Sequence, residues 1–276
     1  MRMVTGASAL AALVGLLLSC LVGCSEDRPP IEYLALGDSA PFGYRLNAPG
    51  GYEDDDDFVG YPALLADDRD LELLDLSCPG ETTASFLDVD APNLCTNYDG
   101  SGREGRGYRE RAPLHTNYDG AQVEAAVRAL ENSSEVELVT LQLGANDIVV
   151  CGANLECSTR EGVAAMAEQA RENLDTALTA LREDGGYEGT IVVVNYSAYK
   201  YEADNPELAV IEALNAAIAD AAGAHDAVVA DAFEAFRTAA EEDGGDVRRA
   251  GLVHPDDTHP TAVGQRLIAR TVEALI

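Results

Sequence analysis

Positive charge is scarce in this sequence, and lysine is nearly absent. The chain has 18 lysines and arginines against 49 aspartates and glutamates, which gives a formal net charge of −31, and Lys200 is its single lysine. Such an excess of negative charge repels polyanions, so nucleic acids and anionic lipid head groups are not expected as main partners. Tryptophan is absent as well, but 47% of the residues are hydrophobic. That apolar content is ordinary for a globular protein and predicts a folded core.

Long apolar runs are also lacking, except for a short one near the N-terminus. Residues 9–18 are mostly apolar, follow the positively charged Arg2 and precede several small residues, as in a secretory signal. The run is too short to cross a bilayer, which needs about 20 residues. Residues 21–24, Leu-Val-Gly-Cys, resemble the bacterial lipobox, in which the cysteine is lipidated and becomes the new N-terminus.

This N-terminal pattern predicts three parts in the chain. Residues 1–23 are expected to be a lipoprotein signal peptide, and residues 24–30 to hold the lipidated Cys24 and a short linker. Residues 31–276 are expected to form one domain. The protein is then extracytoplasmic and attached to the bacterial envelope through its lipid alone. Plain secretion, with Cys24 unmodified, is the alternative.

Four more cysteines follow in the chain, at positions 78, 95, 151 and 157. No two of them have the C-x2-C spacing, which disfavours a zinc site. An even number of cysteines in an exported chain predicts disulfides. Three pairings are possible, and we favour the nearest-neighbour one, Cys78–Cys95 with Cys151–Cys157, which closes two short loops.

Apolar segments of strand character alternate with helical segments along residues 31–276. Strands are expected at residues 31–36, 71–76, 136–143, 190–196 and 227–230. Helices are expected at residues 61–67, 121–130, 160–182, 206–222 and 261–275. The alternation predicts an α/β fold with a five-stranded, mostly parallel sheet. In such sheets the active site lies beyond the carboxyl ends of the strands.

Residues 88–120 depart from this alternation and are rich in glycine, aspartate and arginine. We interpret them as a loop insertion at the rim of the sheet. The sequence Thr-Asn-Tyr-Asp-Gly occurs twice in it, which fits two similar turns better than a structural repeat. Its four arginines, at 103, 106, 109 and 111, are more plausible as partners of nearby acids than as a ligand site. The acidic run 54–57 lacks the spacing of a known calcium loop and is interpreted as a solvated loop.

Four short motifs lie after predicted strands or before the last predicted helix. They are Gly-Asp-Ser-Ala at 37–40, Pro-Gly-Glu-Thr-Thr at 79–83, Gly-Ala-Asn-Asp at 144–147, and Asp-Asp-Thr-His-Pro-Thr at 256–261. In this order and context they resemble the SGNH hydrolases, also called the GDSL esterase/lipase family. The resemblance covers residues 31–276 and implies a flavodoxin-like three-layer α/β/α sandwich.

The resemblance also assigns roles, and the chemistry of the residues agrees with them. Ser39 is the expected nucleophile, His259 the base that takes its proton, and Asp256 the acid that orients the imidazole. The backbone N–H groups of Ser39 and Gly80 and the side-chain amide of Asn146 are the expected oxyanion hole. Gly80 suits this role because a residue without Cβ lets the backbone approach a substrate.

Alternatives stay open for two of these residues. Asp257 competes with Asp256 as the orienting acid, and the histidines at 115, 225 and 254 compete with His259 as the base. Asp38 and Asp147 lie in the motifs but are interpreted as structural supports. The chain has no Gly-x-Ser-x-Gly sequence, which disfavours an ordinary α/β-hydrolase.

The sequence therefore predicts a monomeric serine ester hydrolase, an esterase or lipase that works through an acyl-enzyme. Its partner is an ester substrate, either a lipid, a small ester or an acylated glycan. No metal or organic cofactor is expected. A glycan O-deacetylase and a catalytically inactive surface-binding lipoprotein are the alternatives, and an interaction role for residues 88–120 is a further possibility.

Overall fold

A computed structural model describes residues 30–48, 51–96 and 107–276. Five parallel strands form a single sheet in the order β2-β1-β3-β4-β5. The strands are β1 (Tyr33–Gly37), β2 (Leu73–Asp75), β3 (Leu138–Gln142), β4 (Thr190–Val194) and β5 (Val228–Ala230). The predicted parallel sheet is confirmed, and each strand lies within or overlaps the segment expected from its apolar run. Cys24 and the proposed signal and linker lie outside the described residues.

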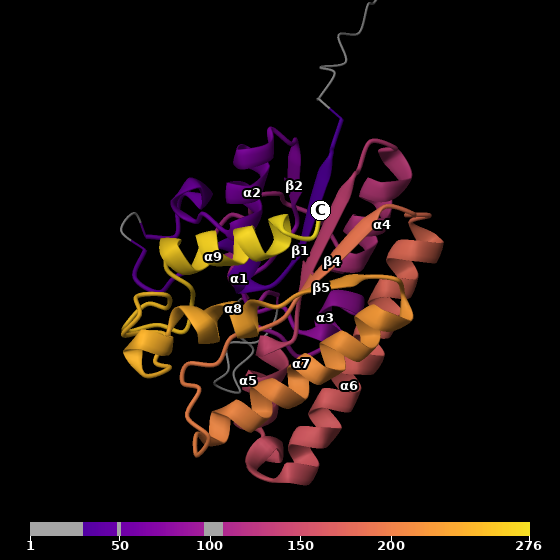
Figure 1. Ribbon diagram of the computed structural model, residues 1–276. Coiled ribbons are helices and arrows are strands. Elements are labelled where there is room, and N and C mark those ends of the chain that lie inside the picture. The colour runs from indigo at the N-terminus through magenta and orange to yellow at the C-terminus, as the bar shows by residue number, and fades with distance from the viewer. Residues whose placement is uncertain (1–29, 49–50, 97–106) are drawn as a thin grey trace, which may run out of the picture.

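Helices cover both faces of the sheet and complete the three-layer fold (Figure 1). One face packs against α4 (Gln122–Asn132), α6 (Arg160–Thr179) and α7 (Pro206–Ala224). The other packs against α2 (Tyr61–Arg69), α8 (Ala232–Ala239) and α9 (Ala262–Glu273). Burial of both sheet faces explains why strands such as β4 are apolar nearly throughout.

Three short helices begin close to the carboxyl ends of strands. They are α1 (Ser39–Phe42), α3 (Thr83–Leu87) and α5 (Ala145–Ala153). Each starts within one of the sequence motifs, which had not been predicted as helical. The motifs therefore hold helix N-termini at the carboxyl edge of the sheet, where backbone N–H groups are unpaired and favour negative charge.

Glycine at the end of β1 allows the chain to turn into α1. Gly37 has a φ of 137°, and a Cβ there would lie 2.2 Å from the backbone oxygen of Gln142 on β3. Any other residue would push the two central strands apart at this edge. The glycine thus fixes Asp38 and Ser39 directly above the sheet.

No helix within the described residues is both long and apolar enough to span a bilayer. Both expected disulfides are confirmed, Cys78–Cys95 and Cys151–Cys157. The four sulfur atoms are therefore bonded in pairs, and the zinc alternative does not apply to them.

Candidate active site

Ser39 is the first residue of α1, and a local cap holds it in place. The Asp38 carboxylate accepts a hydrogen bond from the Ala40 N–H at 2.9 Å, and Asp38 N–H donates to Gln142 O at 3.1 Å. Ser39 consequently lies at the carboxyl edge of the sheet, where it lines a cavity. The predicted position of the nucleophile agrees with this placement.

His259 contacts Ser39 although the two residues are 220 positions apart in the sequence. Its Nε2 lies 2.9 Å from Ser39 Oγ. The segment that carries it is tied to α1, because the Gln265 amide donates to Ala40 O at 2.9 Å and Gln265 accepts from Tyr61 N–H. The geometry places nucleophile and base within hydrogen-bond reach of each other.

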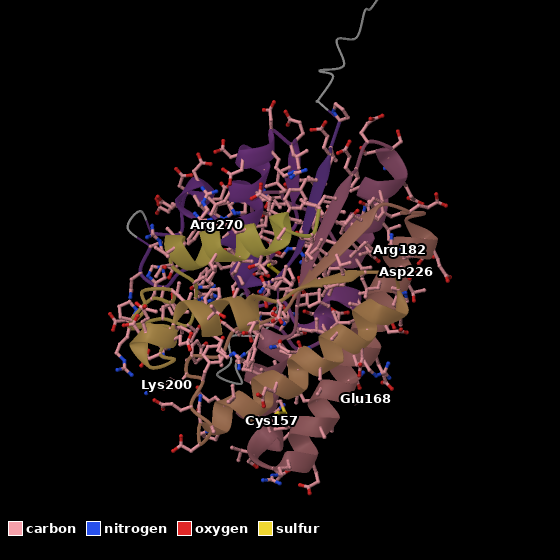
Figure 2. All side chains as sticks on the ribbon, in the orientation of Figure 1. Cys157, Glu168, Arg182, Lys200, Asp226 and Arg270 are labelled. Carbon is pink, nitrogen blue, oxygen red and sulfur yellow. A yellow bond between two sulfur atoms is a disulfide. The ribbon has the colours of Figure 1, made fainter. Side chains whose placement is uncertain are left out.

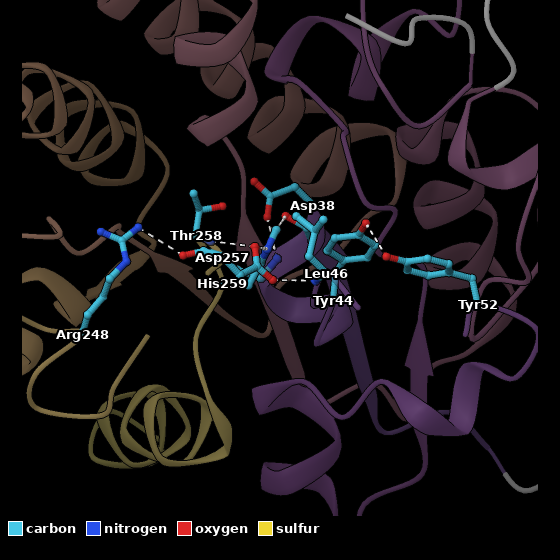
Figure 3. A network of polar contacts seen from close by, with 10 residues as sticks. Asp38, Tyr44, Leu46, Tyr52, Arg248, Asp257, Thr258 and His259 are labelled. Atoms are coloured by element: carbon cyan, nitrogen blue, oxygen red, sulfur yellow. Dashed lines mark hydrogen bonds and ion pairs between the residues drawn. The ribbon is translucent and has the colours of Figure 1, made fainter. Parts of the chain in front are cut away.

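Asp257, not Asp256, contacts the imidazole, so the prediction of Asp256 as orienting acid is wrong. Asp257 Oδ1 lies 2.6 Å from His259 Nδ1, and its side chain is buried (Figure 3). The Asp256 side chain is exposed. The tight turn between the acid and the histidine points the second of the two neighbouring aspartates inward.

Backbone donors fix the Asp257 carboxylate. The Leu46 N–H donates to Oδ2 at 2.5 Å and the Thr258 N–H to Oδ1 at 2.6 Å. Partial burial by itself raises the pKa of Asp257, but the hydrogen bond and charge of His259 and these two amides outweigh it and lower the pKa to about 2. Asp257 is therefore ionised at neutral pH and can only accept.

The charge of Asp257 determines the tautomer of His259. An ionised carboxylate requires a proton on Nδ1, so the neutral ring has its lone pair on Nε2. That nitrogen can accept the Ser39 proton. The arrangement is a nucleophile, a base and an orienting acid in contact, as acyl transfer requires.

The other histidines are engaged elsewhere. His115 contacts Phe42 O and the Asp55 carboxylate, while His225 contacts Asp175 at 2.8 Å. The backbone N–H of His254 donates to His259 O, which stabilises the turn of the catalytic segment. Among the four, only His259 contacts Ser39 in the described structure.

Of the three donors expected at the reacting carbonyl, Ser39 and Asn146 line the same cavity. The backbone N–H groups of Ser39 and Gly80 donate no hydrogen bond within the described residues. Asn146, the second residue of α5, donates to Glu81 O at 2.9 Å and lies 3.5 Å from Asp38 Oδ2. One Asn146 N–H is thus held by backbone, and the second has only a long contact.

The reason for glycine at position 80 differs from the one expected. Gly80 has a φ of 93°, and a Cβ there would lie 2.3 Å from the Leu94 Cβ. Leu94 also donates its N–H to Gly80 O at 2.9 Å. The missing side chain makes room for Leu94 of the 88–120 segment.

Sequence reasoning did not find the aromatic support of His259. The Tyr44 ring packs edge-on against the imidazole with centroids 4.8 Å apart, and the Tyr44 hydroxyl contacts that of Tyr52 (Figure 3). The residues from Tyr44 to Leu46 thus touch both the base and its orienting acid. No motif marks this segment, because its role depends on contacts more than 200 positions away in the chain.

Buried carboxyl groups lie behind the reacting residues. Asp38 is fully buried and accepts from the Tyr196 hydroxyl at 2.6 Å, and burial raises its pKa to about 6. Glu81 accepts from Gln122 at 3.2 Å, and burial raises its pKa to about 7. Asp147 accepts from Thr83 N–H at 2.9 Å. Asp38 and Asp147 thus hold α1 and α3, consistent with the supporting role expected for them.

Burial of Glu81 predicts lower stability at pH 8 than at pH 5. Its ordinary pKa of 4.5 rises to about 7 in the folded protein, so between these values the folded state binds more protons than the unfolded state. The free energy of unfolding therefore falls as pH rises through this window. The loss is on the order of 2–3 kcal/mol, or about 5–10 °C in Tm.

Thermal unfolding of Glu81→Gln between pH 5 and pH 8 measures this contribution. The variant should lose a clear part of the pH dependence. Exposed Glu131→Gln, which changes net charge equally, should keep the parental profile. A parental pH dependence in Glu81→Gln would show that Glu81 does not carry the effect.

The Cys78–Cys95 disulfide closes the loop that contains Gly80 and Leu94. Replacing both cysteines by serine should lower stability by about 3 kcal/mol, since the bond closes a loop of 17 residues. It should also lower kcat while the sheet stays folded, because the Gly80 N–H loses its support. Activity and far-UV circular dichroism below Tm check this expectation.

The second disulfide supplies the matched control for activity. Cys151–Cys157 joins the end of α5 to the turn before α6, where Figure 2 labels Cys157. Its double serine variant should lose stability with a smaller change in kcat. Equal kcat in the folded Cys78/Cys95 variant and the parent would contradict the proposed link to Gly80.

The cavity at Ser39 has a volume of about 470 Å³ and is largely apolar. We call it the catalytic cavity, the space lined by Ser39, His259 and Asn146. Its walls come mainly from α5, α7 and the segments 195–199 and 253–260. Its apolar lining includes Leu94, Ile148, Val210, Ile211, Phe236 and Ile268. Such a volume and lining suit a small organic ligand. Leu94 shows that the predicted insertion contributes to the wall.

The two arginines described in the insertion do not line this cavity. Arg109 donates to Gly120 O and Tyr118 O and lies over the Tyr118 ring, 4.4 Å from its centroid. Arg111 donates to Gly107 O at 3.3 Å. They bind backbone carbonyls and a ring instead of the acids expected. The arginines at 103 and 106 lie outside the described residues.

Comparison with known families agrees with this geometry. The model of the GDSL-like lipase/acylhydrolase family matches residues 35–267, and the chain belongs to this family. Comparison with curated proteins gives no match. The family and the contact between Ser39 and His259 together define the protein as a hydrolase that acts on ester bonds.

Solved structures of similar fold are distant in sequence. Phospholipase A1 from Streptomyces albidoflavus NA297 is 20% identical, with a TM-score of 0.54 over 89% of this chain and 99% of its own. The lipase Lip_vut3 from a goat rumen metagenome is 15% identical, with a TM-score of 0.55 over 88% and 96%. An acetyl-xylooligosaccharide esterase from Geobacillus stearmophilus is 12% identical, with a TM-score of 0.52 over 88% and 93%. At these identities the likeness establishes the fold.

Proposed function

We propose that the protein is a serine esterase that cleaves carboxylic esters through an acyl-enzyme on Ser39. The contact of Ser39 Oγ with His259 Nε2 at 2.9 Å, backed by Asp257, carries this proposal. The proposed oxyanion hole consists of the Ser39 and Gly80 N–H groups and the Asn146 amide. The apolar wall of the catalytic cavity supports an acyl chain as the bound group.

In the acylation half, Ser39 Oγ attacks the ester carbonyl carbon while His259 Nε2 takes its proton. The carbonyl oxygen becomes negatively charged and receives hydrogen bonds from the three donors, and the Asp257 carboxylate stabilises the imidazolium. The bond to the leaving alcohol then breaks, and the alcohol takes the proton from His259. An ester between the acyl group and Ser39 remains.

In the deacylation half, a water molecule replaces the alcohol. It attacks the acyl carbon as His259 removes a proton from it, and the same donors bind the new oxyanion. Collapse breaks the bond to Ser39 Oγ, which takes the proton back from His259. The carboxylic acid leaves and the enzyme returns to its starting state.

A series of p-nitrophenyl esters from acetyl to palmitoyl tests this function. Residues 25–276, made without lipid under oxidising conditions, should cleave these esters, fastest at an acyl length that fills the catalytic cavity. A sharp preference for acetyl would favour the alternative of a glycan O-deacetylase. A folded protein that cleaves none of them would favour a binding lipoprotein.

We also propose that the protein acts outside the cytoplasm, anchored by lipid on Cys24. The lipobox-like sequence at residues 21–24 supports this, and so does the pair of disulfides, which persist in oxidising compartments. Mass spectrometry of the protein from a bacterial host should find a diacylated or triacylated Cys24 as N-terminus. An unmodified residue at this position would leave plain secretion as the explanation.

A further inference from the structure

The charged side chains that line the catalytic cavity are negative. Besides His259, they are the carboxylates Asp38 and Glu207, and no lysine or arginine is among the described lining residues. Asp38 lies buried at the floor and Glu207 is exposed in the first turn of α7. A negative charge on a substrate would therefore meet no cation in the cavity away from the reacting carbonyl.

An unpaired acceptor lies in the same wall. Gln142 Oε1 is buried and has no hydrogen-bond partner among the described residues, while its amide nitrogen donates to Asn195 O at 3.2 Å. Gln142 lines the catalytic cavity, at the end of β3 beside Asp38. The partial negative charge of this oxygen attracts a cation or a hydrogen-bond donor and repels an anion or a second acceptor.

Two cations near the cavity contact other groups, and Arg45, which lies between Tyr44 and Leu46, is not among the lining residues. The Arg248 guanidinium stacks on the Tyr199 ring, 4.5 Å from its centroid, and donates to Asp257 O at 3.1 Å. The Lys200 ammonium is 3.9 Å from Asp246, and Figure 2 shows Lys200 at the periphery of the molecule. The electrostatic potential around the whole protein is negative, as are the carboxylates of the cavity, because the chain carries a net charge of −31.

We propose that the catalytic cavity selects esters by the charge of the group remote from the reacting carbonyl. Neutral and cationic alcohols are accepted, anionic ones are rejected, and Glu207 provides the preference for a cation. The rings of Tyr196 and Phe236 in the lining suit an alkylammonium, which binds well among aromatic rings and a carboxylate. This proposal rests on the esterase function and names its substrate class.

Three butyrate esters that differ in charge test the selection. The choline and 3,3-dimethylbutyl esters have nearly the same shape and differ by one positive charge, and the 3-sulfopropyl ester is anionic. At low salt, kcat/KM measured by acid release should be about threefold to tenfold higher for the choline ester than for the neutral one. For the anionic ester, kcat/KM should be lower than for the neutral ester by a similar factor. In 0.5 M NaCl both differences in kcat/KM should become smaller, because salt screens the charges.

A matched pair of variants distinguishes the effect of the Glu207 charge from the effect of the protein's overall negative charge. Glu207→Gln should reduce the advantage of the choline ester by about twofold to threefold through KM. Glu212→Gln removes an exposed charge from the same helix and should leave the ratio unchanged. Equal effects of the two variants, or an anionic ester cleaved as fast as the neutral one, would overturn the proposal.

The experiments distinguish a failure of the proposed charge selection from a failure of the proposed esterase function. Cleavage of the neutral ester that depends on Ser39 upholds the function whatever the charge ratios are. If none of the esters is cleaved, calorimetric binding of the same three esters to the protein measures the charge order without turnover. The same order is expected there, and tighter binding of the 3-sulfopropyl ester would overturn the selection.

Discussion

Ser39→Ala should reduce ester hydrolysis by a factor of about ten thousand or more in kcat. The variant keeps the cavity and the proposed oxyanion donors but has no atom to form the acyl bond. KM should change little, because the lost hydroxyl adds little to binding of the ground state. Initial rates with p-nitrophenyl butyrate, measured on protein free of host esterases, check the expected loss.

Ser77→Ala is a suitable control for this variant. Ser77 is buried and its hydroxyl donates to Asp75 at 2.5 Å, away from His259. Its substitution should cost stability but leave kcat within a few-fold of the parent. Retention of a tenth or more of the parental rate in Ser39→Ala would rule out this serine as the nucleophile.

Asp257→Asn should lower kcat by about a thousandfold to ten-thousandfold, while Asp256→Asn should leave it within twofold. An amide at position 257 can donate to Nδ1 and thereby favours the tautomer with the proton on Nε2, which cannot accept the Ser39 proton. The exposed Asp256 has no such contact. Steady-state kinetics of the two variants provide the comparison.

The pair also has an internal check on folding. Both substitutions remove one negative charge from neighbouring positions, so a difference in kcat with similar circular dichroism reports on the contact with His259. If Asp256→Asn were the inactive variant, the assignment of Asp257 would be wrong. Equal losses in both variants would indicate a general disturbance of the turn.

The sheet could be predicted from the sequence because its three central strands, β1, β3 and β4, are buried nearly throughout. Apolar runs such as the one in β4 mark such strands without reference to the rest of the chain. Helix α1 was missed because it has only four residues, includes Pro41, and depends on the cap from Asp38. Helix α8 was missed as well, being a short amphipathic segment that packs against α9.

The candidate site was predicted in part, and the limit has a physical reason. Ser39 and Asn146 follow from motifs at the ends of strands, where the fold places reacting groups, and His259 follows from the motif before the last helix. The choice between Asp256 and Asp257 depends on which carboxylate receives the Leu46 N–H, a contact 211 positions away. Such a contact leaves no signal in the local sequence.

The acyl-enzyme itself is the central claim, and a covalent probe tests it most directly. Ser39 Oγ should attack the phosphorus of a fluorophosphonate while His259 takes its proton, so that a P–O bond forms and fluoride leaves the probe. Peptide mass spectrometry should locate one phosphonyl group on Ser39. Asp257→Asn should react much more slowly than the parent. A probe adduct on any other residue, or no adduct on a folded protein that cleaves esters, would contradict the account.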